Sequence, residues 1–287
     1  MMRCPRTMDI QEIRKAIIEH VAASAFKITP RHLEQTITET YSLDRTRTKA
    51  LLKDLVIQGE LEYAYEFGST YLVPSFSKPV RISAQVVIMP PGHQYLRERD
   101  DVVIQIKPGA AFGGGRHPST RLSVEGIEFV LKEIRPDWLN RDCSVLDIGT
   151  GSAILAIAAV GLGIRKAVGI DIDPCAVAEA RENIALNNYE DQIAISERKI
   201  DAINRSFSMV VANLRYPSLK KLYRQVTRLT DPNGWAVLSG FRPHEKQDLI
   251  ELYTARYFQC VWAADQLGWS SVVLKKRFTK KKGEHRN

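Results

Sequence analysis

The sequence predicts an α/β protein, with a Rossmann-like sheet of seven strands, the last one antiparallel, preceded by a smaller helical domain. From about residue 119 to residue 274, strand-like apolar runs alternate with helical segments, as in a mostly parallel sheet with helices on both faces. The first of these strands ends in a glycine-containing turn that opens a helix. Residues 1–78 have a different pattern, in which three predicted helices are followed by one β-hairpin.

Length and composition restrict the class of protein. The chain has 287 residues, 44% hydrophobic and 26% charged, which suggests two globular domains and excludes a disordered, collagen-like or disulfide-dense protein. Its four cysteines include no Cys-x-x-Cys pair, so we expect no metal site. No apolar run has transmembrane length, and the first residues lack the apolar region of a signal peptide. We therefore expect a cytoplasmic protein without membrane contact.

The net charge of +8 is unevenly distributed. Residues 1–80 carry 11 Lys/Arg and 10 Asp/Glu, residues 81–274 carry 23 and 22, and residues 275–287 carry 7 and 1. The body is thus nearly neutral, and residues 278–287 form a basic tail. We interpret the tail either as a solvated chain end or as a weak, salt-dependent tether to an RNA-rich partner such as a ribosome.

Residues 1–78 have the element order of a winged helix. The expected helices begin at Asp9, at Thr29-Pro30 and after Ser42 or Asp44, Gly59 ends the third, and strands 61–67 and 70–73 form the hairpin. In the third helix we expect Ala50, Leu51, Leu55 and Val56 to face inward. Its exposed face carries Arg45, Arg47, Lys49 and Lys53, offset by two aspartates. Both nucleic-acid contact and protein docking stay open for this domain.

Residues 79–107 are interpreted as a connector with two strand-like runs, 80–89 and 101–107. The larger domain is assigned to residues 108–277. Its expected strands are 144–148, 167–171, 193–196, 208–214, 235–239, 258–263 and 269–274. Its expected helices are 119–134, 152–162, 174–187, 217–229 and 243–256. A short turn between the last two strands predicts an antiparallel edge.

The glycine turn after the first strand points to a particular cofactor. Gly149 and Gly151 let the backbone turn tightly and approach a ligand, but residue 154 is Ile, so the dinucleotide fingerprint fails. Asp147 stands just ahead of the first glycine, where a carboxylate would repel a pyrophosphate and suit a ligand with an ammonium and a sulfonium. We therefore predict an S-adenosylmethionine site.

Two further acids fit this cofactor. Asp171 ends the second strand 22 residues after Gly149, where it would accept hydrogen bonds from both ribose hydroxyls. Asp173 lies beyond the strand end and is the less favoured ribose partner. Asp201 is placed to meet the adenine amino group.

Several segments resemble the PrmA family of ribosomal protein methyltransferases. Residues 108–120 are similar to its A-F-G-T-G-x-H-x-T-T signature, and Val210-Val-Ala-Asn-Leu214 is similar to its V-V-A-N-I. The likeness covers about residues 105–277. It implies a class I methyltransferase that uses S-adenosylmethionine to methylate amino groups, most simply of lysine, in a protein such as a ribosomal protein.

The chain departs from the family pattern at several points. Gly114 replaces a Thr, Ser119 replaces the first Thr of a pair and Ala153 replaces a Gly. Residues 1–75 do not match the family's substrate-binding αβ sandwich. The identity of the substrate is therefore open.

The resemblance and the strand order assign roles to further residues. Asn213 is expected to accept a hydrogen bond from the amine and to touch the cofactor, and Tyr216 to wall the pocket. A lid formed by Phe112, Gly113 and Gly115 is expected over the cofactor. His117 would orient this lid. Either Ser119 or Thr120 would cap the next helix, with Thr120 reaching the cofactor.

Three functions are carried forward. The first is a PrmA-type protein N-methyltransferase. The second is an RNA or DNA methyltransferase whose winged helix binds the nucleic acid, and the third is a nucleic-acid-binding regulator that senses the cofactor. Small-molecule substrates also stay open.

Overall fold

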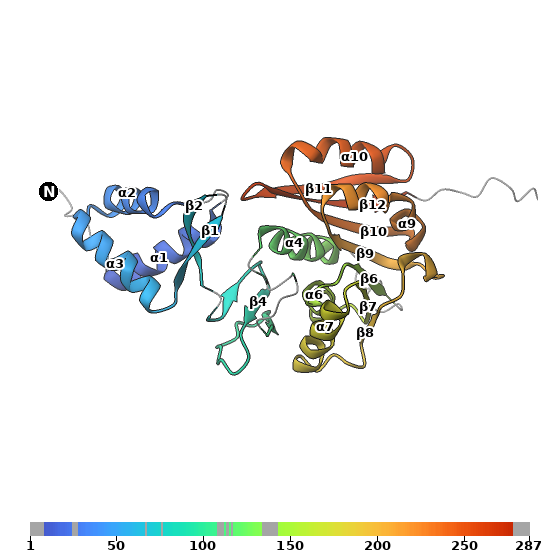
Figure 1. The fold of residues 1–287 in the computed structure, drawn as a ribbon, viewed down its shortest axis with the longest axis horizontal. Helices are drawn as coiled ribbons and strands as arrows, with labels where there is room; N and C mark the ends of the chain where they lie inside the picture. The colour runs from blue at the N-terminus through green and yellow to red at the C-terminus, as the bar shows by residue number, and fades with distance from the viewer. Residues whose placement is uncertain are drawn as a thin grey trace, which may run out of the picture. The chain divides into compact units, whose positions relative to one another are not determined.

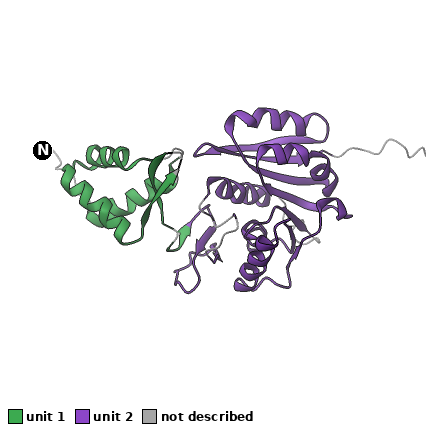
Figure 2. Cartoon of the chain, viewed as in Figure 1, with its two compact units in different colours: residues 1–80 green, residues 81–287 purple. Residues whose placement is uncertain are grey.

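A computed structural model describes residues 9–24, 28–66, 68–75, 77–107, 112, 115, 117–133 and 143–277. The chain divides into two compact units, residues 1–80 and 81–287 (Figure 2). This division falls two residues after the boundary expected from the sequence. The basic tail, residues 278–287, and Gly113 of the expected lid lie outside the described residues.

The first unit contains the three expected helices and the expected hairpin. The helices are α1 (Ile10–Ala23), α2 (Pro30–Tyr41) and α3 (Arg45–Ile57), and the antiparallel strands are β1 (Leu61–Glu66) and β2 (Ser69–Pro74). One apolar core joins these elements, with Ile17, Leu33 and Leu55 fully buried. Burial of such aliphatic side chains is the main force that holds so small a unit together.

Local hydrogen bonds fix where these helices begin. The Thr29 side chain accepts from the His32 amide at 3.3 Å, and the Asp44 side chain accepts from the Arg47 amide at 2.8 Å. Asp44 is therefore the cap of α3, whereas Ser42 ends α2 in the left-handed region at φ 50°. The inward face of α3 was predicted imperfectly, since Ala50 is exposed and Leu52 is buried.

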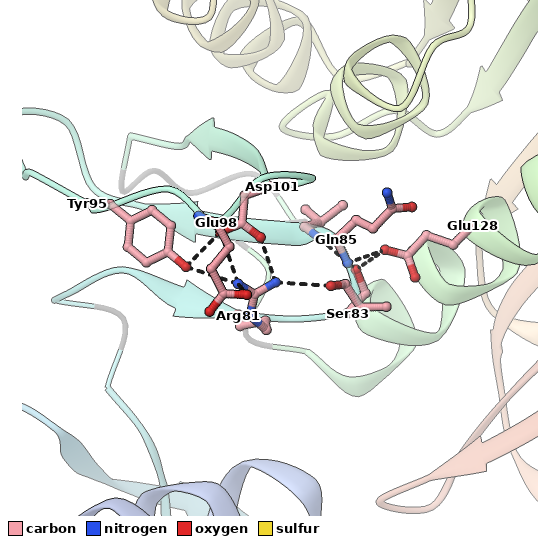
Figure 3. Close-up of polar contacts among 9 residues, drawn as sticks. Arg81, Ser83, Gln85, Tyr95, Glu98, Asp101 and Glu128 are labelled. Carbon is pink, nitrogen blue, oxygen red and sulfur yellow. Dashed lines mark hydrogen bonds and ion pairs between the residues drawn. The ribbon is translucent and has the colours of Figure 1, made fainter.

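The segment expected as a connector forms a small sheet of its own. Strands β3 (Val80–Arg81), β4 (Val86–Met89) and β5 (Val102–Gln105) pair in the order β3-β4-β5, so the predicted run 80–89 is two strands rather than one. Figure 3 shows Arg81 and the Tyr95 hydroxyl converging on Asp101. The hydrogen bond from Arg81 holds the pKa of Asp101 below its usual range.

This small sheet is attached to the larger one by buried polar contacts. Glu128 Oε1 accepts from Ser83 Oγ at 2.6 Å and from the Gln85 amide at 2.9 Å (Figure 3). At the other end, the Gln105 amide donates to Asn187 Oδ1 at 2.9 Å. Residues 81–107 are therefore part of the second unit rather than a linker.

The second unit is built on one seven-stranded sheet. Its strands are β6 (Ser144–Ile148), β7 (Lys166–Ile170), β8 (Ile193–Ser196), β9 (Phe207–Asn213), β10 (Thr230–Phe241), β11 (Phe258–Gln266) and β12 (Trp269–Lys276). The order is β11-β12-β10-β9-β6-β7-β8, with β12 antiparallel to both neighbours. The predicted sheet is confirmed. However, β12 lies between β10 and β11, and β11 is the edge strand.

Helices cover both faces of this sheet (Figure 1). One face carries α4 (Pro118–Glu133), α6 (Ile154–Gly161) and α7 (Pro174–Leu186). The other carries α8 (Tyr216–Lys221), α9 (Tyr223–Leu229) and α10 (Lys246–Thr254). The short 3₁₀ turns η1 (Ile200–Ala202) and η2 (Pro243–Glu245) precede β9 and α10. The helix predicted over 217–229 is thus divided at Leu222. Within the described residues, no helix has the length and apolarity needed to cross a membrane.

Candidate active site

The polar residues predicted for the site gather where the strand order reverses. Going along the chain, β7 and β8 are added on one side of β6, and β9 and β10 on the other. Such a switch point leaves a crevice outside the carboxyl ends of the two central strands. Asp147 lies at this end of β6, and Asn213 is the last residue of β9.

Asp147 is a buried carboxylate with one oxygen uncommitted. Its side chain is fully buried, and Oδ2 accepts from Thr150 Oγ1 at 2.8 Å. Oδ1 is buried and has no hydrogen-bond partner among the described residues. Burial away from water raises the pKa of Asp147 to about 7, and the nearby Asp171 carboxylate adds to the rise. A cation at Oδ1 would stabilise the ionised form.

The glycine turn brings backbone close to backbone. Gly149 and Gly151 have φ of 71° and 53°, a region that glycine adopts without strain. A Cβ on Gly151 would lie 2.2 Å from the carbonyl oxygen of Phe112. That same carbonyl accepts from the Ser152 amide at 3.0 Å, so the turn contacts the first residue of the expected lid.

The two neighbouring aspartates after β7 have different partners for their side chains. Asp171 Oδ2 accepts from the Gly151 amide at 3.0 Å and Oδ1 from the Asp173 amide at 3.1 Å, so Asp171 belongs to the glycine turn. Asp173 instead caps α7 by accepting from the Cys175 amide at 2.9 Å. Asp201 lies in η1, exposed, and accepts from Gln225 Nε2 at 3.1 Å.

Asn213 and Thr120 meet although 93 residues separate them. Asn213 Nδ2 donates to Thr120 Oγ1 at 3.4 Å, and Thr120 is fully buried. Asn213 Oδ1 is buried and lacks a partner among the described residues. Gly240, with φ 92°, leaves room for this oxygen, since a Cβ there would lie 2.7 Å from it. The amide is thus held by its nitrogen and presents its oxygen.

His117 anchors the start of α4 and stands in an aromatic row. Its Nδ1 accepts from the Ser119 amide at 3.2 Å and lies 2.7 Å from Ser119 Oγ. Helix α4 begins at Pro118, so His117 caps it rather than Ser119 or Thr120 as predicted. The His117 ring lies 5.0 Å from the Phe112 ring and 4.5 Å from the Trp269 ring, between centroids.

Two more predicted site residues, Gly115 and Tyr216, contact other parts of the second unit. Gly115, with φ 81°, packs so tightly that a Cβ would lie 2.0 Å from Ile88 Cδ1. The Tyr216 hydroxyl is hydrogen-bonded to Asp248 of α10, and the Lys220 ammonium lies 5.2 Å from its ring. The Tyr216 hydroxyl is therefore engaged by α10 rather than by Asn213.

Sequence reasoning missed three residues of this site. Thr150 donates a hydrogen bond to Asp147, Gly240 makes room for Asn213, and Trp269 makes an edge-to-face contact with His117. The pattern Leu238-Ser-Gly-Phe241 at a strand end was a signal for Gly240. Within the described residues, no group of three His, Cys, Asp or Glu side chains is arranged to hold a metal ion.

The chain was compared with known proteins. The family model "Ribosomal protein L11 methyltransferase (PrmA)" matches residues 72–277. A ribosomal protein L11 methyltransferase of Citrifermentans bemidjiense is 37% identical over 199 residues, which cover 69% of this chain and 64% of that protein. One of Heliobacterium modesticaldum is 31% identical over 203 residues, covering 70% and 62%. The chain thus spans less than two thirds of the length of these relatives.

A solved structure supports the same grouping. The ribosomal protein L11 methylase of Lactobacillus delbrueckii subsp. bulgaricus matches with a TM-score of 0.62 and 28% identity, over 70% of this chain and 99% of that one. The second unit thus has the class I methyltransferase fold. Because the family model covers most of the chain and the matching residues include the whole site, the chain belongs to the PrmA family of ribosomal protein L11 methyltransferases.

Proposed function

We propose that this chain is an S-adenosylmethionine-dependent methyltransferase of the PrmA type that methylates lysine amino groups of a ribosomal protein in the cytoplasm. The observation that carries the proposal is the pair of buried oxygens, Asp147 Oδ1 and Asn213 Oδ1, at the ends of adjacent central strands. A buried oxygen without a partner is costly, so it is expected where a ligand will supply one.

The residues present fit S-adenosylmethionine. Asp147, whose pKa near 7 reflects burial without a countercharge, would hold the cationic end of the cofactor. Gly149 and Gly151 keep the turn tight beneath the proposed cofactor, because a Cβ at either position would meet Leu214 or the Phe112 carbonyl. Asp171, beside the glycine turn, would accept from the ribose hydroxyls, and Asp201 is proposed for the adenine. When bound, the cofactor supplies a methyl group on a sulfonium, which is already a good leaving group.

The remaining task of the chain is to orient a neutral amine. A lysine amine has an ordinary pKa near 10.4, and a dry site lowers it. Asn213 Oδ1 would accept a hydrogen bond from this amine and so direct the nitrogen lone pair. Thr120 supports this role by occupying the Asn213 nitrogen at 3.4 Å, which leaves the oxygen free to accept. We assign Tyr216 a packing role rather than a catalytic one, because its hydroxyl is hydrogen-bonded to Asp248.

The domain assignment is also part of this proposal. Residues 1–78 are assigned as a winged-helix-like domain, supported by the helix and hairpin order and by the Leu72 amide, which donates to Ile28 O at 2.9 Å and so adds a third extended segment. We propose that this domain recognises the substrate, that residues 108–277 catalyse the transfer and that residues 278–287 form the tail, whereas residues 81–107, expected as a connector, belong to the second unit. The family model begins at residue 72, so most of this domain lies outside the residues that it matches.

Calorimetric binding of S-adenosylhomocysteine tests the site. We expect Asp171→Ala to weaken binding at least tenfold, because the lost carboxylate would leave two ribose hydroxyls unpaired. Asp173→Ala is the matched control, since Asp173 only caps α7, and its affinity should stay within twofold of wild type. Equal affinity for wild type and Asp171→Ala would refute the cofactor assignment.

Transfer of a radiolabelled methyl group into a cell lysate tests the substrate class. The proposal predicts label that protease removes and ribonuclease does not. Label removed only by ribonuclease or by deoxyribonuclease would instead establish a nucleic-acid methyltransferase. Cofactor binding with no label in any fraction would favour a regulator that senses the cofactor.

A further inference from the structure

The second unit carries a strongly basic surface that the proposed methyl transfer does not use. Residues 198–230 contain eight Lys/Arg and one Asp/Glu, although residues 81–274 as a whole are almost balanced. All eight basic side chains are exposed. We call this set the α8–α9 band: Arg198, Lys199, Arg205, Arg215, Lys220, Lys221, Arg224 and Arg228.

The band is continuous because of how α8 and α9 pack. Leu219, Val226 and Leu229 are buried against the sheet, which turns the positions between them outward. Arg224 and Arg228 are four residues apart on α9, about 6 Å along the helix axis, and Lys220 and Lys221 end α8 just before the break at Leu222.

The segment before β9 joins this row through Arg228. Its Nη1 donates to Ile203 O at 2.6 Å and its Nη2 to Ile200 O at 3.4 Å. Because these acceptors are neutral carbonyls, Arg228 keeps its full positive charge. The contacts also bring η1 and the flanking Arg198, Lys199 and Arg205 to the end of α9.

Most charges of the band are not neutralised. Lys220 pairs with Asp248 at 3.0 Å, and Arg205 lies over the Phe207 ring. In the part of the chain that the structure describes, no ion pair is formed by the remaining six, Arg198, Lys199, Arg215, Lys221, Arg224 and Arg228. On α3, Arg45 pairs with Glu34 and Arg47 with Asp44, which leaves Lys49 and Lys53 as its two cations outside the ion pairs of the described residues. More unneutralised positive charge therefore lies on the band than on the helix expected to bind nucleic acid.

We infer that the α8–α9 band binds the phosphodiester backbone of a single-stranded nucleic acid. A run of exposed cations, most of them outside ion pairs, matches a chain of phosphates, and Arg binds phosphate with two parallel hydrogen bonds. The chemistry disfavours a protein partner, because stable protein interfaces have an apolar centre. The exposed large apolar side chains of the described residues all lie outside 198–230.

Fluorescence anisotropy of the full chain tests this inference, with fluorescein-labelled U20 RNA and dT20 DNA titrated at several salt concentrations. Each backbone contact in single strands contributes about 0.7 to the slope of log K against log salt, or about fivefold in affinity at 0.1 M. The variant Arg198→Gln/Lys221→Gln/Arg224→Gln should therefore bind about a hundredfold more weakly, with a slope smaller by about 2. The matched control, Arg47→Gln/Lys49→Gln/Lys53→Gln on α3, removes the same charge and should bind like wild type.

The two probes separate the sources of phosphate, since tighter binding of U20 identifies RNA and tighter binding of dT20 identifies DNA. Circular dichroism spectra and thermal transitions equal to those of wild type show that each variant is folded. The inference is overturned if wild type binds neither probe, or if the α3 variant loses as much affinity as the band variant. It is also overturned if labelled poly-L-glutamate binds the band while neither nucleic acid does, which would make the partner an acidic protein. A failure of the methyl-transfer proposal would leave these results unaffected.

Discussion

The first unit and the site of the second unit treat buried polar groups in opposite ways. In the first unit, buried Thr48 accepts from Thr38 Oγ1 at 3.2 Å and donates to Asp44 O at 3.1 Å. Arg14, with only 13% of its side chain exposed, contacts both Asp54 and Gln58. Within the described residues, the four buried side-chain oxygens that lack a partner all belong to the second unit, and two of them, Asp147 Oδ1 and Asn213 Oδ1, lie at the site.

The glycines show the same contrast. Gly68 in the hairpin turn has φ 78° and open space around it, so it serves only the turn. Gly151 has φ 53° and backbone 2.2 Å from where a Cβ would lie. In the first unit, buried polar groups are hydrogen-bonded and the turn glycine is uncrowded. At the site, several neighbouring positions lack one or the other of these features. Such concentrated departures are expected where structure is kept for a ligand.

The largest effect that tests this contrast is predicted for Asp147→Asn. A folded pKa near 7, against 3.8 for the free side chain, means that the folded state binds the proton more tightly than the unfolded chain. The ionised carboxylate therefore costs stability, and this cost grows as pH rises from about 4 to about 7. Removing the charge should stabilise the ligand-free chain by up to about 4 kcal/mol at pH 8, and by less than half of that at pH 5.

Urea unfolding followed by tryptophan fluorescence measures this change. All four tryptophans of the sequence lie after residue 80, so the signal reports on the second unit. The same variant should bind S-adenosylmethionine at least tenfold more weakly, because the countercharge for its cation is gone. A variant no more stable than wild type at pH 8 would contradict the contrast.

A smaller effect is predicted for Gly151→Ala, compared with Gly68→Ala. Both introduce a Cβ at positive φ, which costs about 1 kcal/mol. At Gly151 the Cβ also meets the Phe112 carbonyl, so we expect a total of about 3 kcal/mol and loss of S-adenosylhomocysteine binding. Tryptophan fluorescence follows the first variant, and circular dichroism at 222 nm follows the second. Equal costs at the two positions would mean that the glycine turn is not crowded.

The residues of the site that depend on local geometry were predictable from the sequence. Asp147, Asp171 and Asn213 each lie at a strand end next to turn residues, and the carboxyl ends of parallel strands meet at one edge. The strand–helix alternation predicted six of the seven strands in their parallel directions for the same reason. Short-range periodicity is enough for such features because it reflects which face of each element is buried.

Features that depend on distant parts of the chain were not predictable. Either of the last two strands could pair with β10, and their local sequences are similar. The sequence therefore does not show that β12 lies between β10 and β11. The contact between Thr120 and Asn213 joins residues on α4 and β9, and no periodicity reports it. Nor does the sequence show that Asp147 Oδ1 lacks a partner, since that requires knowing every group around it.

The smallest predicted effect concerns Arg14, and its sign is opposite to that of Asp147→Asn. Arg14 is mostly buried and lies 2.5 Å from Asp54 Oδ2, but the Asp54 side chain is 46% exposed and would stay solvated after the loss of its partner. We therefore expect Arg14→Met to destabilise the first unit by about 1 kcal/mol, below the cost of breaking a fully buried pair.

The control Lys15→Met removes a charge from the same helix, where the ammonium is 79% exposed and 3.8 Å from Glu19, and should cost a few tenths of a kcal/mol. Because the first unit contains no tryptophan, the difference should appear in circular dichroism at 222 nm and leave the fluorescence transition unchanged. If Arg14→Met instead stabilised the unit, its polar groups would be strained like those of the site, and the contrast between the two regions would not hold.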